Sequence, residues 1–131
     1  MDSIEQTIFE LLSSDESLVA IVGDRIYPNY VPKGRLLPAV TYQRIGGAGD
    51  YNIEGRSDVG ECLFQVNGWA STYEAAVALS DAIIECLDGL ATGPIGMIEV
   101  SAEGDVPDLS AENDQLDAYG RRLEFRIHYE T

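Results

Sequence analysis

The chain has 131 residues, 45% of them hydrophobic, and its 23 acidic and 8 basic residues give a net charge of −15 at pH 7. This length suits one domain spanning residues 1–131, which buries about two-thirds of its unfolded surface. No apolar run approaches the roughly 18 residues that span a bilayer, and the polar N-terminus does not resemble a signal peptide, so we expect a soluble intracellular product.

Apolar residues at helical spacing predict a first helix, capped by Ser3 with Gln6 at the capping-box position. Asp15 follows a break at Ser13 and Ser14 and is expected to cap a second, short helix. The expected buried residues of the two helices are Ile4, Ile8, Leu11, Leu12, Leu18, Val19 and Val22.

Gly23 can take the positive φ that ends helices, so the second helix is expected to stop there. A short strand is predicted over Arg25–Tyr27, followed by a loop containing Pro28, Pro32 and Pro38.

Four later segments alternate between apolar and polar residues, which predicts strands with one buried face. The inward residues are expected to be Val40, Tyr42, Cys62, Phe64, Val66, Ile98, Val100, Leu123, Phe125, Ile127 and Tyr129. The outward ones are expected to be Thr41, Gln43, Ile45, Leu63, Gln65, Asn67, Trp69, Arg122, Glu124, Arg126 and His128.

A long helix is predicted between the second and third of these strands, with Ser71 as its cap, Glu74 three residues on, and Gly89 at its end. Its buried stripe is expected to be Ala75, Ala76, Leu79, Ile83, Cys86 and Leu87. Together these elements predict an α+β fold: a mainly antiparallel or mixed sheet of about four strands, with the long helix and the N-terminal helices packed on one face.

Three separated blocks of sequence share one resemblance. They are LVAIVGDRIYP with LPAVTYQRIGG (18–28 and 37–47), GECLFQVNGWASTYEAAVALSDAIIECLDGL (60–90) and RRLEFRIHYE (121–130). In order and spacing they resemble the tail-completion proteins of long-tailed phages, also called tail terminators or head-to-tail joining proteins. The resemblance implies a homohexameric ring, and it implies extended loops that contact neighbouring subunits, the tail tube or the head-side connector.

The outer face of the sheet is a candidate subunit or partner interface. Ile45, Leu63 and Trp69 are too apolar for a fully wet surface, whereas Arg122 and Arg126 are too polar for a core. Such mixtures are typical of protein–protein interfaces, where Trp and Arg are enriched. A Trp69 side chain tucked under a local loop is the alternative.

Two segments are long for loops of a compact domain, which is typical of functional or disordered segments. The first, 46–59, is expected to make protein contacts and adds the interface candidates Tyr51, Asn52, Ile53 and Arg56. The second, 103–118, is a candidate acidic loop whose role stays open, with solvated loop as the alternative. Its acidic residues are Glu103, Asp105, Asp108, Glu112, Asp114 and Asp117.

Charge is unevenly distributed, because no Lys or Arg occurs between Ser57 and Gly120. Such an acidic surface repels phosphate and disfavours specific DNA binding. It serves either solubility or salt adaptation, or it lines a channel through which DNA slides without sticking.

No pattern indicates catalysis, a cofactor or a metal site. The 2 cysteines, Cys62 and Cys86, and the single histidine, His128, do not make a zinc site. The cysteines are expected to be reduced and packed as small hydrophobic residues, with a disulfide between them as the alternative. Neither a phosphate-binding glycine loop nor an EF-hand pattern is present.

We therefore expect a non-enzymatic virion protein, a ring that caps the head-proximal end of the tail tube, ends tail growth and helps to join the tail to the head. Its expected partners are further copies of itself, the tail tube protein and head-completion or neck proteins, with DNA passing through the ring. It would be assembled in the host cytoplasm and reside at the neck of the virion. A head-side stopper and a small-ligand-binding α+β module are the alternatives.

Overall fold

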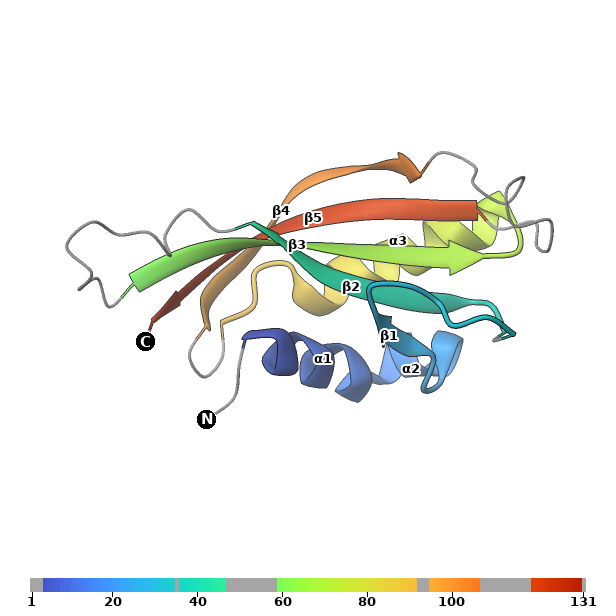
Figure 1. The fold of residues 1–131 in the computed structure, drawn as a ribbon, viewed down its shortest axis with the longest axis horizontal. Coiled ribbons are helices and arrows are strands. Elements are labelled where there is room, and N and C mark those ends of the chain that lie inside the picture. The colour runs from blue at the N-terminus through green and yellow to red at the C-terminus, as the bar shows by residue number, and fades with distance from the viewer. Residues whose placement is uncertain (1–3, 35, 47–58, 92–94, 107–118, 131) are drawn as a thin grey trace.

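The computed structural model describes residues 4–34, 36–46, 59–91, 95–106 and 119–130. The described residues form three helices and one five-stranded sheet (Figure 1). In chain order the elements are α1 (Ile4–Ser14), α2 (Glu16–Val22), β1 (Ile26–Pro28), β2 (Ala39–Gly46), β3 (Val59–Ala70), α3 (Tyr73–Leu87), β4 (Ile95–Val106) and β5 (Tyr119–Glu130).

The strands lie in the order β1-β2-β3-β5-β4, and every neighbouring pair is antiparallel except the parallel pair β1–β2. The predicted α+β fold is therefore confirmed, with a mixed sheet of five strands among the described residues where about four were expected. In Figure 1, α1 and α2 lie beside the β1 and β2 side of the sheet, and α3 crosses behind β3 and β5.

The core lies between the sheet and the helices, and the predicted inward residues of the strands face it. One outward prediction is wrong, because Thr41 is only 2% exposed and its hydroxyl accepts from the Trp69 indole. Cys62, Phe64 and Val66 on β3 are fully buried, as are their register partners on β5. Tyr42 and Val100 are partly buried and pack against the same core. The buried residues of β5 are Leu123, Phe125, Ile127 and Tyr129.

Both cysteines lie buried in this core as thiols, outside any disulfide. Burial raises the pKa of the Cys86 thiol to about 12, and the nearby Asp15 carboxylate adds to the shift. The neutral thiol donates to the Leu11 carbonyl over 3.5 Å, which links α3 to α1.

Helix α3 begins one residue later than predicted. The Oγ1 atom of Thr72 accepts a hydrogen bond from the Ala75 amide at 3.1 Å, so Thr72 is the N-cap in place of Ser71. This shift leaves Ala75 exposed, which corrects its assignment to the buried stripe; the other predicted residues of the stripe are buried. At the other end Gly89 has a φ of +81°, as expected for a helix terminus.

Gly68 on β3 allows α3 to approach the sheet closely. A Cβ atom at Gly68 would lie 3.0 Å from Cγ of Leu79 on the helix. Close approach of helix and strand is one of the roles that glycine takes inside a strand.

The N-terminal helices follow the prediction, except that Ile4, Leu11 and Val19 are only partly buried. Ile8, Leu12, Leu18 and Val22 are fully buried, and the Asp15 carboxylate accepts from the Leu18 amide at 2.9 Å as the cap of α2. Gly23 ends α2 with a φ of +62°. The predicted cap at Ser3 lies outside the described residues.

The free edge of β4 is partly covered by the chain that follows α3. Gly89 donates to the Ile98 carbonyl at 2.7 Å, and the Ile98 amide donates to the Leu90 carbonyl at 3.0 Å. Farther along the strand, the Asp88 carboxylate accepts from the Val100 amide at 2.9 Å. Covering an edge in this way prevents unwanted strand pairing.

Candidate assembly interface

The outer face of the sheet, turned away from the helices, holds the candidate interface. Strand register places its side chains in rows that cross β2, β3, β5 and β4. Of the predicted interface residues, Ile45, Leu63, Trp69, Arg122 and Arg126 lie on this face. Tyr51, Asn52, Ile53 and Arg56 lie outside the described residues.

Trp69 lies flat against one end of this face. A Cβ atom on Gly120, its register partner, would fall 2.7 Å from the indole ring, so the ring occupies the space that a side chain at residue 120 would need. The indole N–H donates to the Thr41 hydroxyl at 3.0 Å. Trp69 is thus half-buried by neighbouring strands, and its polar atom is satisfied.

Ile45 stands where the β2–β3 register shifts between Arg44 and Gly46. Such a bulge re-aims the side chain of the extra residue. The Ile45 side chain is 38% exposed and lies next to Leu63, which pairs with Gly46 on one side and with Arg126 on the other. We call the line of Ile45, Leu63, Arg126 and Glu99 across the four strands the Ile45 row.

Ion pairs hold the charged side chains of the outer face in place. Arg126 binds the Glu61 carboxylate at 2.9 Å and approaches Glu99 at 4.0 Å. Nε2 of His128 lies 3.4 Å from the same Glu99 carboxylate, and Arg122 lies 3.7 Å from Glu124. Exposed pairs of this kind contribute at most about 1 kcal/mol each, so they orient the surface more than they stabilise the fold.

The first part of the predicted acidic loop is strand, because β4 continues to Val106. Glu103 and Asp105 therefore lie on β4, opposite Leu123 and Arg121, which corrects their assignment to a loop. Asp108, Glu112, Asp114 and Asp117 lie outside the described residues.

Arg121 organises this end of the sheet on the helix side. Its guanidinium binds the Asp105 carboxylate at 2.8 Å and lies 3.9 Å from Glu103. The Tyr73 hydroxyl at the start of α3 donates to the same Asp105 carboxylate at 3.2 Å. The hydrogen bond from Arg121, assisted by that from Tyr73, lowers the pKa of Asp105. The sequence analysis did not predict this cluster. Arg121 was a signal for it, because it shares the inward face of β5 with core residues, and a charged side chain there needs a partner of opposite charge.

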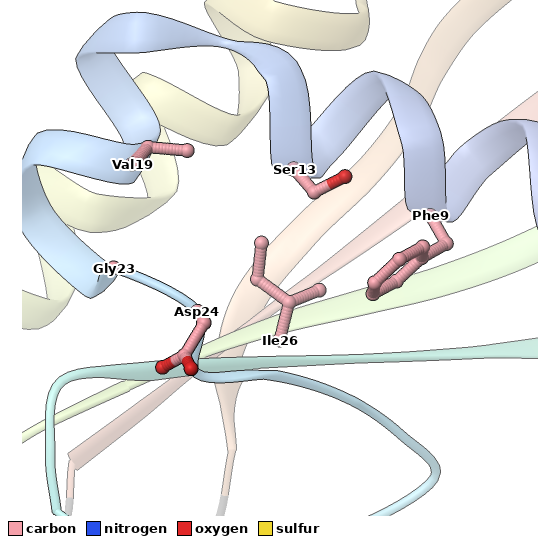
Figure 2. A pocket seen from close by; sticks show the side chains of 6 residues that line it. All are labelled: Phe9, Ser13, Val19, Gly23, Asp24 and Ile26. Atoms are coloured by element: carbon pink, nitrogen blue, oxygen red, sulfur yellow. The ribbon is translucent and has the colours of Figure 1, made fainter.

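A pocket of about 360 Å³ opens on the helix side, between α1, α2 and β1 (Figure 2). Phe9, Val19 and Ile26 point toward one another across it, and the Asp24 carboxylate turns away from them at the rim. We call this the helix-side pocket; its lining residues are Phe9, Ser13, Val19, Gly23, Asp24 and Ile26. One signal in the sequence pointed to it, because Phe9 is a large apolar residue outside the predicted buried face of α1.

The described part of the chain contains no cluster suited to a metal ion and no membrane-spanning helix. Among its residues, no group of three or more His, Cys, Asp or Glu side chains is placed to hold a metal ion. No helix in the described ranges is both long and apolar enough to cross a membrane. The features that stand out are surfaces suited to protein contacts.

Both the sequence and the fold are similar to those of known proteins. The family model described as tail completion protein gp17 matches residues 6–130. A chain of a solved structure, the virion of a native gene transfer agent particle, matches with a TM-score of 0.71 and 21% sequence identity, covering 95% of this chain and 92% of that chain. No curated protein sequence matches significantly.

The structural match shows that the two chains share a fold, and the family match extends over almost the whole sequence. The protein described here therefore belongs to the tail completion protein gp17 family.

Proposed function

We propose that this protein forms a closed ring at the head-proximal end of a phage tail tube, where it ends tail growth and offers a joining surface for the head. Family membership supports the coarser part of this statement, a structural role in tail assembly and a place in the virion. The ring, its position at the neck and its six-fold symmetry are the parts that we propose.

The outer sheet face is the observation that carries the proposal. In the part of the chain that the structure describes, all three helices pack on the other side of the sheet, which leaves this face open. This face presents Trp69, whose ring lies against Gly120, together with the exposed Ile45 and two ion-paired arginines. Tryptophan and arginine in an ordered setting are the residue types that dominate binding energy at interfaces.

The proposed mechanism is geometric and needs no chemical step. Copies of one chain close a ring through unlike patches, and the two sides of that ring then match two different partners, the tail tube protein and a head-completion or neck protein. The family is a structural one, and this favours a non-enzymatic protein.

The strong negative charge suits such a ring. Helix α3 carries Glu74, Asp81 and Glu85 and contains no Lys or Arg. A carboxylate-rich surface that faces a passing DNA duplex repels its phosphates and prevents sticking.

Removal of the protein from an assembling phage tests the proposal. Particles made without it are expected to have tails of unregulated length and unjoined heads in electron micrographs, and the wild-type protein supplied in trans should restore joined particles. Tails of normal length with heads that still fail to join would indicate a head-side stopper instead. Normal particles without the protein would contradict both roles.

A further inference from the structure

We infer that neighbouring copies in the ring dock head to tail, with the loop between β1 and β2 of one copy seated on the outer face of α3 of the next. We call residues 29–38 the Lys33 loop, and we call Glu74, Asp81 and Glu85 the α3 stripe. This inference rests on the proposed ring and names two surfaces that close it.

The Lys33 loop combines apolar side chains with a cation. Tyr30 and Leu36 are each 70% exposed, more than any other large hydrophobic side chain in the described ranges. Lys33 lies between them and is exposed. The adjacent Gly34 has a φ of +85°, and a Cβ atom there would meet nothing within 4 Å, so the turn of the loop is uncovered in the single chain. Apolar side chains gathered in this way on a surface mark sites of protein contact.

Lys33 is the basic residue of the described ranges whose charge is unpaired. The described arginines all have partners: Arg44 binds Glu5, Arg121 binds Asp105, Arg122 binds Glu124, Arg126 binds Glu61, and Nε of Arg25 donates to the Pro38 carbonyl. Lys33 makes neither an ion pair nor a hydrogen bond with another described residue. Its charge is therefore available to a second molecule, whereas the charges of the outer-face arginines are already matched.

The sequence around Lys33 does not cancel this charge. Residues 25–49 contain Arg25, Lys33, Arg35 and Arg44 and neither Asp nor Glu. At the base of the loop Asp24 and Arg25 are adjacent and offset each other, so the excess positive charge belongs to the loop itself.

The outer face of α3 has the opposite charge. Glu74, Asp81 and Glu85 are spaced by seven and four residues, which places them on one helix face, and all three are exposed. None of them is paired with another described residue. Helix α3 contains no Lys or Arg, and Arg121, which reaches its start, is bound to Asp105. Like charges four residues apart on a helix repel each other, and a cation from a neighbour relieves that repulsion.

The apolar parts of the two surfaces are also complementary. Ala75 and Ala78 lie exposed beside the stripe, so large side chains can approach the helix backbone closely. Seating Tyr30 and Leu36 there removes apolar surface from water on both copies, which is the main driving force of association. Tyrosine is one of the residue types that dominate binding energy at interfaces.

Net charge argues that the occupant is a second copy. Each chain carries a net charge of −15, so two copies attract only where a positive part of one meets a negative part of the other. Every copy carries both the Lys33 loop and the α3 stripe. One lysine against three carboxylates leaves the surroundings of the contact negative, which is compatible with a channel that repels DNA.

The two surfaces are unlike and lie apart on the subunit. The Lys33 loop joins β1 and β2 at one edge of the sheet, whereas α3 crosses behind β3 and β5 (Figure 1). A contact between unlike patches of one chain repeats from copy to copy and closes a ring where the rotation permits it. Two α3 stripes repel each other, as two Lys33 loops do, so neither surface favours a dimer through itself.

Charge exchange tests the inference in assembling phage. Lys33→Glu should lower the yield of joined particles about tenfold or more, and so should Asp81→Lys combined with Glu85→Lys, because each change places like charges across a contact that recurs at every subunit. The three changes together should restore the yield. A triple variant no better than Lys33→Glu alone, or a wild-type yield from both partial variants, would overturn the inference.

Matched controls make the same chemical changes elsewhere. Glu16→Lys alters an exposed carboxylate of α2, outside the stripe, and should neither lower the yield nor rescue Lys33→Glu. Leu36→Asp should lower the yield, whereas Met97→Asp, on a 43% exposed side chain of β4, should not. Equal effects of Leu36→Asp and Met97→Asp would contradict the assigned loop.

Cross-linking in assembled particles reads the contact directly. A chain with Lys33→Cys and Asp81→Cys, treated with a short thiol cross-linker, should give a ladder of linked subunits; Cys62 and Cys86 are buried. A chain with Lys33→Cys and Glu16→Cys is the control and should give none.

The outcomes separate this inference from the function on which it rests. Particles that contain the protein and join their heads, yet give no ladder or the same ladder with the control pair, contradict the contact and leave the proposed function standing. A photoreactive side chain at Leu36 that links to the tail tube protein or to a head-side protein, and not to another copy, contradicts the second copy as occupant. Particles that assemble normally without the protein contradict the function itself.

Discussion

The contact between Trp69 and Gly120 shows how a single glycine fixes the position of a large aromatic side chain on the outer face of the sheet. The indole covers the backbone of β5 and donates to Thr41 at 3.0 Å, so a large aromatic ring is held flat without a covering loop in the described residues. A rigid aromatic group loses little conformational freedom when a partner docks on it, and this favours binding.

Gly120→Ala is expected to push the indole ring away from the backbone of β5, because the new Cβ atom would lie 2.7 Å from the ring. Overpacking of this kind destabilises proteins by about 1–3 kcal/mol. Trp69 is the single tryptophan of the chain, so its fluorescence emission should shift to the red while the thermal unfolding midpoint falls.

Gly104→Ala is the matched control, since nothing lies within 4 Å of its added Cβ atom. It should leave the emission maximum unchanged. An emission maximum for Gly120→Ala equal to that of the wild type would show that the ring does not rest on residue 120.

The Arg121–Asp105 pair makes a pH-dependent contribution to stability. The pKa of Asp105 is lowered in the folded chain, so the contribution is fully present above the ordinary carboxyl pKa of about 3.9. It is lost as the pH falls through the lowered folded value, where the carboxylate takes up a proton.

Asp105→Asn is therefore expected to lower the urea midpoint at pH 7 and to have a progressively smaller effect as the pH falls below about 4. Unfolding curves of both chains across this range give the comparison. Asp81→Asn, on the exposed surface of α3, should lack this convergence. A gap between Asp105→Asn and the wild type that stays constant with pH would refute the ion pair as its source.

Among the secondary-structure elements, α3 is attached at both of its ends to the edge strand β4. Thr72 caps α3 through the Ala75 amide, and Tyr73 then reaches β4 by its hydrogen bond to Asp105. The edge of β4 is covered in turn by residues 88–90, just after the helix. Both ends of α3 are thus tied to the same edge strand.

Thr72→Ala should destabilise the protein by about 1 kcal/mol, the usual effect of losing an N-cap side chain. Ser71→Ala should change the free energy of unfolding by less than about 0.5 kcal/mol, as surface substitutions usually do. Chemical denaturation of the two variants distinguishes them. Equal losses would mean that the cap is shared between the two residues.

The strands and helices were largely predictable because alternation and helical spacing report which face is buried. Residues such as Phe64 and Phe125 lie in the core as their parity predicts. The choice between Ser71 and Thr72 was not predictable, since both residue types cap helices and local spacing allows either. The length of β4 was missed because Glu103 and Asp105 are poor strand formers, and the register with β5 outweighs that preference.

At the scale of the whole molecule, the two sides of the subunit differ in character. The helix side contains the helix-side pocket, whereas the outer sheet face carries Trp69 and two arginines that are ion-paired with glutamates. Two sides of such different character can contact two different surfaces, which the proposed ring requires.

The outer face was predictable in part, because Ile45, Leu63 and Trp69 break the polar pattern expected of a solvent-exposed strand face. The helix-side pocket was not, since it arises where α1, α2 and β1 meet and depends on how these elements pack. Local sequence patterns do not encode the distance between two surfaces.

Image reconstruction of the head-to-tail junction tests the central claim most directly, with the protein located by a small tag or by difference from particles that lack it. The account predicts one closed ring of this chain between the last ring of the tail tube and the head-side connector, with the outer sheet faces turned toward neighbouring subunits. Density for the protein at the tail tip, or single copies at the neck with their outer sheet faces open to solvent, would contradict it.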